Sequence, residues 1–386
     1  MKRCMIGECG AEREPEKEPD SSVAAVLEPV SGKPPRECWL DLGRVLGLFF
    51  IVLFHASGNG MEFPLFFQRV PFLFMAAAYF VGRRKTFDWR HSPCRYILFY
   101  LAWNAAACLE AFFRHLIYLN LGYSSTWDWS MLPWKLTGVG TTFPYDGPLW
   151  FLKYVMVLSL LSPLLFTLRK KNLLIPLTMA VLLSVVLFPR INMLFSDPPR
   201  VPWADSLAFF MLGFCVSSLT LGDIKLFLKK NVVFSLPALA AITWMNSHGI
   251  ISAESLHTML FWVPGILGLG SLCVLLSEKV LFSKIARACA PLFFFIYAVH
   301  CLVLPYMMPL LSGILPSGLL PAAAATFLIF AGAFFLHQWV VRHHPGWEYL
   351  IFAQKRKKAA TAGREEEMCV AGTGSLRSGP INETRL

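Results

Sequence analysis

Two side chains that could do chemistry lie eleven residues apart in one apolar run, WLDLGRVLGLFFIVLFHAS, which covers Trp39 to Ser57. These are Arg44 and His55. At 3.6 residues per turn, eleven residues make about three helical turns, so both side chains share one face with their Cα atoms roughly 16 Å apart. Asp41 lies close to the same face, one turn before Arg44. Because charge is costly inside a bilayer, this spacing predicts a polar stripe along a membrane-spanning helix.

The two residues suit different parts of a group transfer. An unperturbed imidazole titrates near neutral pH, so His55 could remove a proton from a hydroxyl that attacks an acyl group. The guanidinium of Arg44 matches the geometry of a phosphate. Each has an alternative structural explanation, because a buried histidine can satisfy a backbone carbonyl and Arg44 can pair with Asp41 or extend to lipid headgroups.

Other polar residues interrupt the apolar runs. Arg83 and Arg84 follow the second run; they could complete a basic mouth on the donor side or serve only to set topology. Arg69, early in that run, could stabilise an oxyanion near His55 or anchor the helix at the interface. His300, in FFFIYAVHCLV, could form a helix-to-helix hydrogen bond or belong to the polar stripe.

The composition indicates an integral membrane protein. Of 386 residues, 56% are hydrophobic and only 15% are charged, and the mean hydropathy is +0.54; that much apolar surface does not fit into a water-soluble core. The net charge of +11 comes from short basic clusters between apolar runs, which indicates lipid headgroups and topology rather than nucleic acid. Ten cysteines without repeated spacing or a CxxC pair predict neither a disulfide nor a metal site.

The apolar runs predict an all-α bundle of about ten transmembrane helices. They cover approximately 39–57, 63–81, 95–118, 149–168, 173–188, 201–221, 231–246, 256–276, 291–311 and 319–341. Basic clusters follow alternate runs, so the positive-inside rule places both termini in the cytosol. We expect a disordered cytosolic tail at 1–37, the membrane domain at 38–341, and a basic then polar cytosolic tail at 342–386.

Four motifs resemble those of one family. LDLGRVLGLFFIVLFH resembles the first helix of the membrane acyltransferase-3 family, in which LD-x-x-R is followed by ten residues and His. PFLFMAAAY at 71–79, LWFL at 149–152 and FIYAVH at 295–300 match weaker motifs in the same order. Ala77-Ala78 replaces the family's usual Ser-Gly, and Arg83-Arg84-Lys85 replaces an Arg-x-x-Arg spacing. The likeness covers residues 38–341 and is to stand-alone members without an appended esterase-like domain.

The resemblance implies a membrane-bound O-acyltransferase in the cell membrane. Such an enzyme moves an acyl group, commonly acetyl, from cytosolic acyl-CoA to a hydroxyl of a carbohydrate or lipid-linked glycan at the outer face, without a metal. By its motifs, the site residues are a catalytic His55, donor-binding Arg44, Asp41, Arg83 and Arg84, and supporting Arg69, Trp150, Tyr297 and His300. From the polar residues alone, a transporter or exporter of a glycan or small solute that uses the intramembrane Arg and His side chains as a relay stays open.

Overall fold

The computed structural model describes nine ranges of the chain, which are 37–57, 65–84, 93–121, 128–137, 147–187, 203–248, 258–316, 319–344 and 346–353. The chain divides into two units, Met1–Glu37 and Cys38–Leu386, and the described helices belong to the second. The predicted N-terminal tail, apart from Glu37, and the predicted C-terminal tail beyond Ala353 lie outside the described residues.

Within those ranges every regular element is helical, which confirms the predicted all-α class. The longer helices are α1 (Cys38–Ala56), α2 (Leu65–Gly82), α3 (Pro93–Asn120), α7 (Leu174–Leu187), α9 (Trp203–Val216), α11 (Val232–Ser247), α12 (Thr258–Ser277), α14 (Phe293–Ile314) and α15 (Leu319–His343). The shorter ones are α4 (Leu132–Thr137), α5 (Trp150–Leu160), α6 (Ser162–Lys170), α10 (Leu221–Lys230), α13 (Val280–Cys289), α16 (Glu348–Phe352) and the 3-10 turns η1 (Trp129–Met131), η2 (Gly147–Leu149) and η3 (Ala290–Leu292).

Length and apolar composition qualify four helices of the described part as membrane spans, or six if each of two bent helix pairs counts as one span. The four are α1, α3, α14 with the preceding α13, and α15. The bent pairs are α5 with α6 and α9 with α10. Several shorter apolar helices accompany them, so the count of about ten spans and the cytosolic termini stay predictions.

The fourth predicted span, 149–168, is bent and consists of two helices. Helices α5 and α6 meet at 47° around Leu161. Pro163 has no N–H to donate to the carbonyl of Ser159, four residues earlier. The Ser162 hydroxyl donates to that carbonyl instead, at 2.6 Å. The proline therefore breaks the helix without leaving the Ser159 carbonyl unsatisfied.

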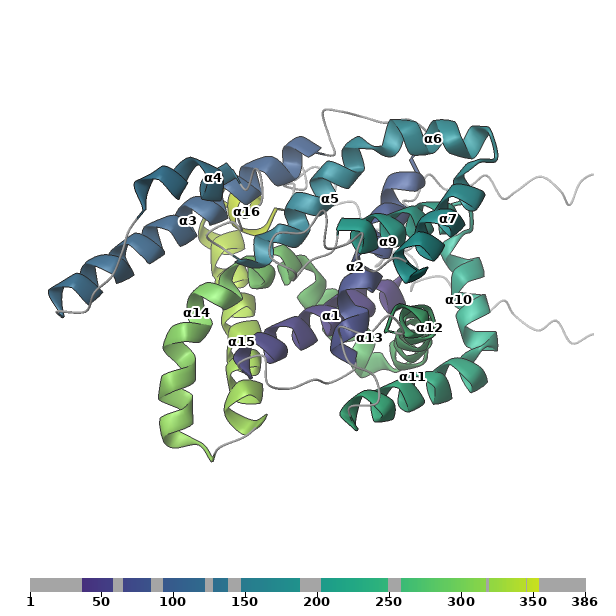
Figure 1. Cartoon of the computed structure of the whole chain (residues 1–386). Helices are drawn as coiled ribbons and strands as arrows, with labels where there is room; N and C mark the ends of the chain where they lie inside the picture. Colours follow the sequence, from purple (N-terminus) through teal and green to yellow (C-terminus); the bar gives the residue numbers. More distant parts are fainter. Residues whose placement is uncertain are drawn as a thin grey trace, which may run out of the picture. The chain divides into compact units, whose positions relative to one another are not determined.

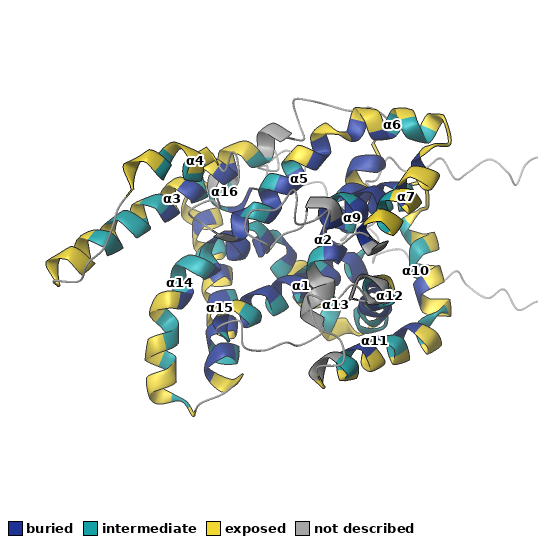
Figure 2. Ribbon diagram, viewed as in Figure 1, coloured by how far each residue is buried: buried dark blue, intermediate teal, exposed yellow. Residues whose placement is uncertain are grey.

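Helix α1 is the most enclosed of the spans. It packs against α2, α12, α13, α14 and α15 (Figure 1). Its burial continues along nearly its whole length, whereas the distal parts of α3 and α14 are exposed (Figure 2). Leu42, Leu48 and Val52 are among its fully enclosed side chains. The helix that carries Arg44 and His55 is thus held by neighbours on several sides.

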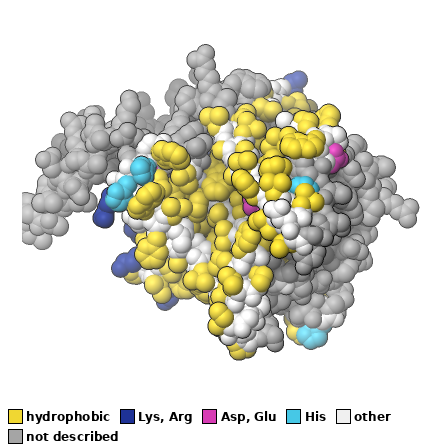
Figure 3. Space-filling view, turned by 90° about the vertical axis from the view of Figure 1, so that its left-hand side faces the viewer, with side chains coloured by type: hydrophobic (Ala, Val, Ile, Leu, Met, Phe, Trp, Pro, Cys, Tyr) yellow, Lys and Arg dark blue, Asp and Glu magenta, His cyan; other side chains and the backbone are white. Residues whose placement is uncertain are grey.

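Large apolar side chains cover much of the outward surface. Helices α3, α14 and α15 expose, among others, Leu109, Phe113, Leu310, Ile314 and Phe335. On the face seen in Figure 3, hydrophobic side chains dominate the described surface, and the visible Lys and Arg side chains lie near its margin. Such a surface is unfavourable in water and suits contact with lipid tails.

The packed unit extends beyond residue 341, where the membrane domain was predicted to end. Helix α16 lies in the segment predicted as tail, and its Phe352 is fully buried. The Phe352 ring lies 5.0 Å from that of Phe295 in α14 and 4.7 Å from that of His337 in α15. This short helix therefore belongs to the core that supports α14.

Helices α2 and α9 approach each other closely at Gly213. A Cβ atom at Gly213 would lie 2.3 Å from the carbonyl oxygen of Met75 and 2.6 Å from its Cα. These are backbone atoms, which a rotamer change cannot move aside. Only glycine therefore permits this approach, an example of the small-residue packing typical of membrane helices.

We expect Gly213→Ala to destabilise the protein by about 1–3 kcal/mol, because the added methyl overpacks the α2–α9 contact. Gly332→Ala in α15 is the matched control, since a Cβ there meets nothing within 4 Å and alanine favours helix. The thermal unfolding midpoint of the detergent-solubilised protein should fall for the first variant and hold or rise for the second. Equal midpoints would contradict the tight contact.

Candidate functional site

The predicted site residues on α1 face helix α14. The Arg44 guanidinium carbon lies 4.9 Å from the ring centre of Phe293, the first residue of α14. At the other end of α1, the ring centres of His55 and His300 are 5.3 Å apart. The two helices therefore run in the same direction here, with one contact near the start of each and a second contact several turns later.

Arg44 also pairs with a buried carboxylate, as one of the sequence alternatives proposed. Its Nη1 lies 3.6 Å from Oδ1 of Asp41, whose side chain is only 9% exposed. The Arg44 side chain is 25% exposed, so the guanidinium is not sealed in the core. Asp41 and the Phe293 ring hold Arg44 in place, and a guanidinium held in this way suits contact with an anion.

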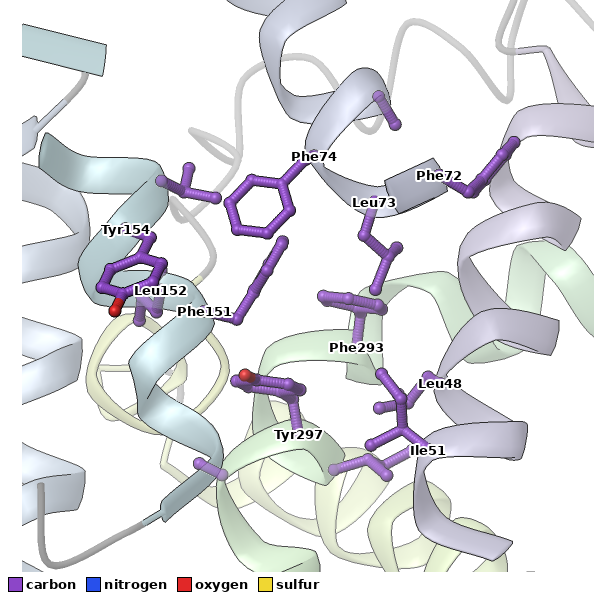
Figure 4. Packing of buried hydrophobic residues seen from close by; sticks show 14 of the residues in the cluster. Leu48, Ile51, Phe72, Leu73, Phe74, Phe151, Leu152, Tyr154, Phe293 and Tyr297 are labelled. Carbon is purple, nitrogen blue, oxygen red and sulfur yellow. The ribbon is translucent and has the colours of Figure 1, made fainter. Parts of the chain in front are cut away.

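The stripe between the two ends is apolar. Leu48 and Ile51 occupy the turns between Arg44 and His55, and both are buried. They point from α1 toward α14, where Phe293 and Tyr297 lie in the same hydrophobic cluster (Figure 4). The predicted stripe is thus polar only at its ends, because leucine and isoleucine supply its middle turns.

His55 and His300 form the polar end that could transfer protons. His55 is exposed in the last turn of α1, and His300 is fully buried in α14. Nδ1 of His300 lies 3.1 Å from the Ile296 carbonyl oxygen. Since a carbonyl only accepts, Nδ1 donates, and in the neutral ring Nε2 then carries the lone pair. The pair thus offers one fixed imidazole and one accessible imidazole, the second of which can act as a general base.

Cys301 joins this pair, which the sequence analysis missed. The side-chain donor atoms of His55, His300 and Cys301 all lie within 4.8 Å of one another. Cys301 is half-buried and is not part of a disulfide. Its position directly after His300 was the available signal, but only the α1–α14 packing shows that His55 reaches both.

Tyr297 and Trp150 support the site at different distances. The Tyr297 hydroxyl donates to the Pro148 carbonyl, which fixes α14 to η2. The Tyr297 ring centre is 6.1 Å from that of His300. Trp150 instead packs in an aromatic cluster with Phe74, Phe151 and Tyr154. Phe151 connects that cluster to Tyr297, with their ring centres 5.8 Å apart (Figure 4). Trp150 is thus connected to the histidines through intervening rings.

Arg83 and Arg84 were predicted to form one basic site with Arg44, but they lie several turns from the point where α2 meets α1. Helices α1 and α2 meet where Gly43 faces Phe72, since a Cβ on Gly43 would lie 2.5 Å from the end of the Phe72 ring. Arg83 is eleven residues beyond Phe72, roughly 16 Å along α2, and both Arg83 and Arg84 are exposed there. Along α2 they therefore lie about three turns beyond the residue that meets Gly43. The side chain of Arg69 is outside the described residues.

Arg169, which the sequence analysis used only to predict topology, holds the C-terminal end of α2 in place. Nη1 of Arg169 donates to the Gly82 carbonyl at 3.2 Å and to the Ser217 hydroxyl at 3.1 Å. Its guanidinium lies about 5 Å from the rings of Phe166 and Phe214. The basic turn after α2 and the basic end of α6 are thus neighbours, which agrees with their predicted place on one side of the membrane.

Comparison with known proteins identifies the family. Residues 38–338 match the acyltransferase family 3 model, which is described as an acyltransferase domain. The match covers most of the chain and includes α1 and α14, and it confirms the resemblance that the sequence motifs indicated. No curated protein and no solved structure matches the chain. The chain therefore belongs to the acyltransferase-3 family and is a multi-pass membrane protein that carries an acyltransferase domain.

Proposed function

We propose that this protein transfers an acyl group, with acetyl the expected one, from cytosolic acyl-CoA to a hydroxyl of a carbohydrate or lipid-linked glycan at the outer face of the cell membrane. The observation that carries the proposal is the arrangement of α1. One end of the helix holds an anchored guanidinium and the other an accessible imidazole beside a buried one. Family membership supplies the acyltransferase class.

The Arg44 end suits the donor. Acyl-CoA carries phosphates at one end and its thioester at the other, with an extended arm between them. A guanidinium held by Asp41 and Phe293 is preorganised for such phosphates. Exposed Arg83 and Arg84 contact the same anion farther out, because the several phosphates of CoA can bridge separated cations.

The His55 end suits the reaction itself. The acceptor hydroxyl gives its proton to His55 as its oxygen attacks the thioester carbonyl. The carbon–sulfur bond then breaks, and the CoA thiolate takes a proton to leave as the free thiol. In the covalent variant, His55 is acylated first and the hydroxyl attacks the acyl-imidazole. Buried His300, fixed by the Ile296 carbonyl, positions His55.

The orientation follows from the basic residues. Arg83, Arg84 and Arg169 lie at one end of α2 and α6, and we assign this end to the cytosol by the positive-inside rule. His55 then lies toward the outer side. Ten spans and two cytosolic termini complete the proposed topology.

Sealed vesicles test the reaction. Acetyl-CoA labelled in its acetyl group is supplied to the face that bears the basic turns, with a glycan acceptor on the other face. Label that appears on the glycan, in proportion to the amount of this protein, supports the proposal. Movement of unlabelled glycan or another solute without donor consumption would instead identify a transporter.

We expect His55→Ala to lower the transfer rate by about 10²–10⁴-fold, since the general base is removed. His343→Ala is the matched control, because His343 is likewise exposed in the last turn of a long helix. Initial rates are compared at equal amounts of membrane-inserted protein. A His55→Ala variant that turns over at the rate of the control would exclude His55 as the base.

We expect Arg44→Lys to raise the KM for acyl-CoA about tenfold and to change kcat little, because a point charge cannot make the paired contacts of a guanidinium. Lysine keeps a cation beside Asp41, so folding is preserved. Arg342→Lys, at an exposed position of α15, should leave KM unchanged. Donor titrations that give the same KM for both variants would show that Arg44 does not bind the donor.

A further inference from the structure

We propose that His55, His300 and Cys301 form a binding site for a divalent cation of the Zn²⁺ type. The three residues come from the end of α1 and the middle of α14. They supply two imidazole nitrogens and one sulfur with a largest separation of 4.8 Å. This proposal revises the expectation of a chain without a metal site, which rested on the spacing of residues in the sequence and on the family resemblance.

The geometry is close to a coordinating one. Zn²⁺ binds nitrogen at about 2.0–2.1 Å and sulfur at about 2.3 Å, so the donors of a tetrahedral site lie roughly 3.3–3.8 Å from one another. The present set therefore has to contract by about 1 Å at its widest separation. His55 is exposed and can supply this movement by side-chain rotation, whereas buried His300 provides a fixed ligand.

The surroundings of His300 favour metal binding. Ligating histidines usually donate the N–H of their other ring nitrogen to a carbonyl or carboxylate, which orients the ring. Nδ1 of His300 has such a partner in the Ile296 carbonyl at 3.1 Å. This contact leaves Nε2, on the far side of the ring, as the atom that binds the metal.

The donor set selects the class of ion. Two imidazoles and a thiolate suit Zn²⁺ and the softer transition metals, whereas Mg²⁺ and Ca²⁺ require oxygen ligands. The ion binds the deprotonated sulfur, so one proton leaves the Cys301 thiol as the metal–sulfur bond forms. Three protein ligands leave a fourth position open for water.

Metal binding would also affect acyl transfer, a consequence that rests on the proposed function. A metal bound to the nitrogen that removes the acceptor proton occupies its lone pair, so His55 could no longer act as a base. The cation should therefore inhibit transfer reversibly, and a chelator should restore it. A Cys301 variant distinguishes this effect from nonspecific inhibition by zinc, because Cys301 is a proposed metal ligand with no part in the proposed proton transfer.

The binding test uses the full chain without a polyhistidine tag, reconstituted in lipid nanodiscs, stripped with a chelator and titrated with Zn²⁺. We expect one tightly bound Zn²⁺ per chain, a zinc X-ray absorption spectrum with one sulfur and two imidazole nitrogens, and the release of protons on binding. A spectrum without sulfur, or the absence of a tight site, would overturn the proposal. Neither donor nor acceptor is present, so this result is independent of whether the protein transfers acyl groups.

Variants assign the ligands. Cys301→Ser and His300→Gln should each weaken Zn²⁺ binding by more than roughly tenfold, since even the loss of an outer-shell contact commonly costs that much. Cys289→Ser is the matched control, because Cys289 is likewise half-buried and outside any disulfide. Unfolding midpoints of the metal-free proteins show whether each variant is folded. Equal zinc affinity in folded Cys301→Ser and Cys289→Ser would exclude Cys301 as a ligand.

Discussion

A carboxylate buried in an apolar helix bundle needs a cation within reach, and Asp41 meets this need through Arg44. The pairing fixes the guanidinium close to α1, where it also lies over the Phe293 ring at the start of α14. His300 is roughly 10 Å farther along α14, and His55 roughly 16 Å beyond Arg44 along α1. The contacts at both ends therefore set the register of the two helices, and the proposed chemistry at His55 depends on it.

The apolar middle of this helix pair separates two kinds of recognition. Leu48 and Ile51, together with Phe293 and Tyr297, leave little room for water between Arg44 and His55. A dry section of this kind suits a thioester, which water would otherwise hydrolyse. The same packing explains why polarity is confined to the ends, where one guanidinium and one imidazole remain accessible. In the proposed reaction, the arm of the donor enters between these apolar side chains.

The sequence predicted much of the helical pattern, because long apolar runs with basic clusters at their ends are typical of membrane spans. It also indicated that Arg44 and His55 share a face, since helical periodicity alone decides this. The sequence could not predict which residues of different helices contact each other. The distance between Arg44 and Arg83 depends on where α1 and α2 cross, and the role of Cys301 depends on the packing of α14. The bend before Pro163 could have been expected from the proline, but the apolar run continues through it.

The contact between Gly213 and Met75 limits where the protein can open. At this point no side-chain layer separates the two helices, so a shift of α2 against α9 cannot be absorbed there by a change of rotamer. Between α1 and α14, by contrast, side chains make the contacts, such as Arg44 with Phe293 and His55 with His300. Helix α14 contains Pro305 and Pro309 a few residues beyond His300, and each proline removes one main-chain hydrogen bond. Beyond His300, α14 therefore lacks two main-chain hydrogen bonds of a regular helix, whereas α2 and α9 are locked together at their main chains.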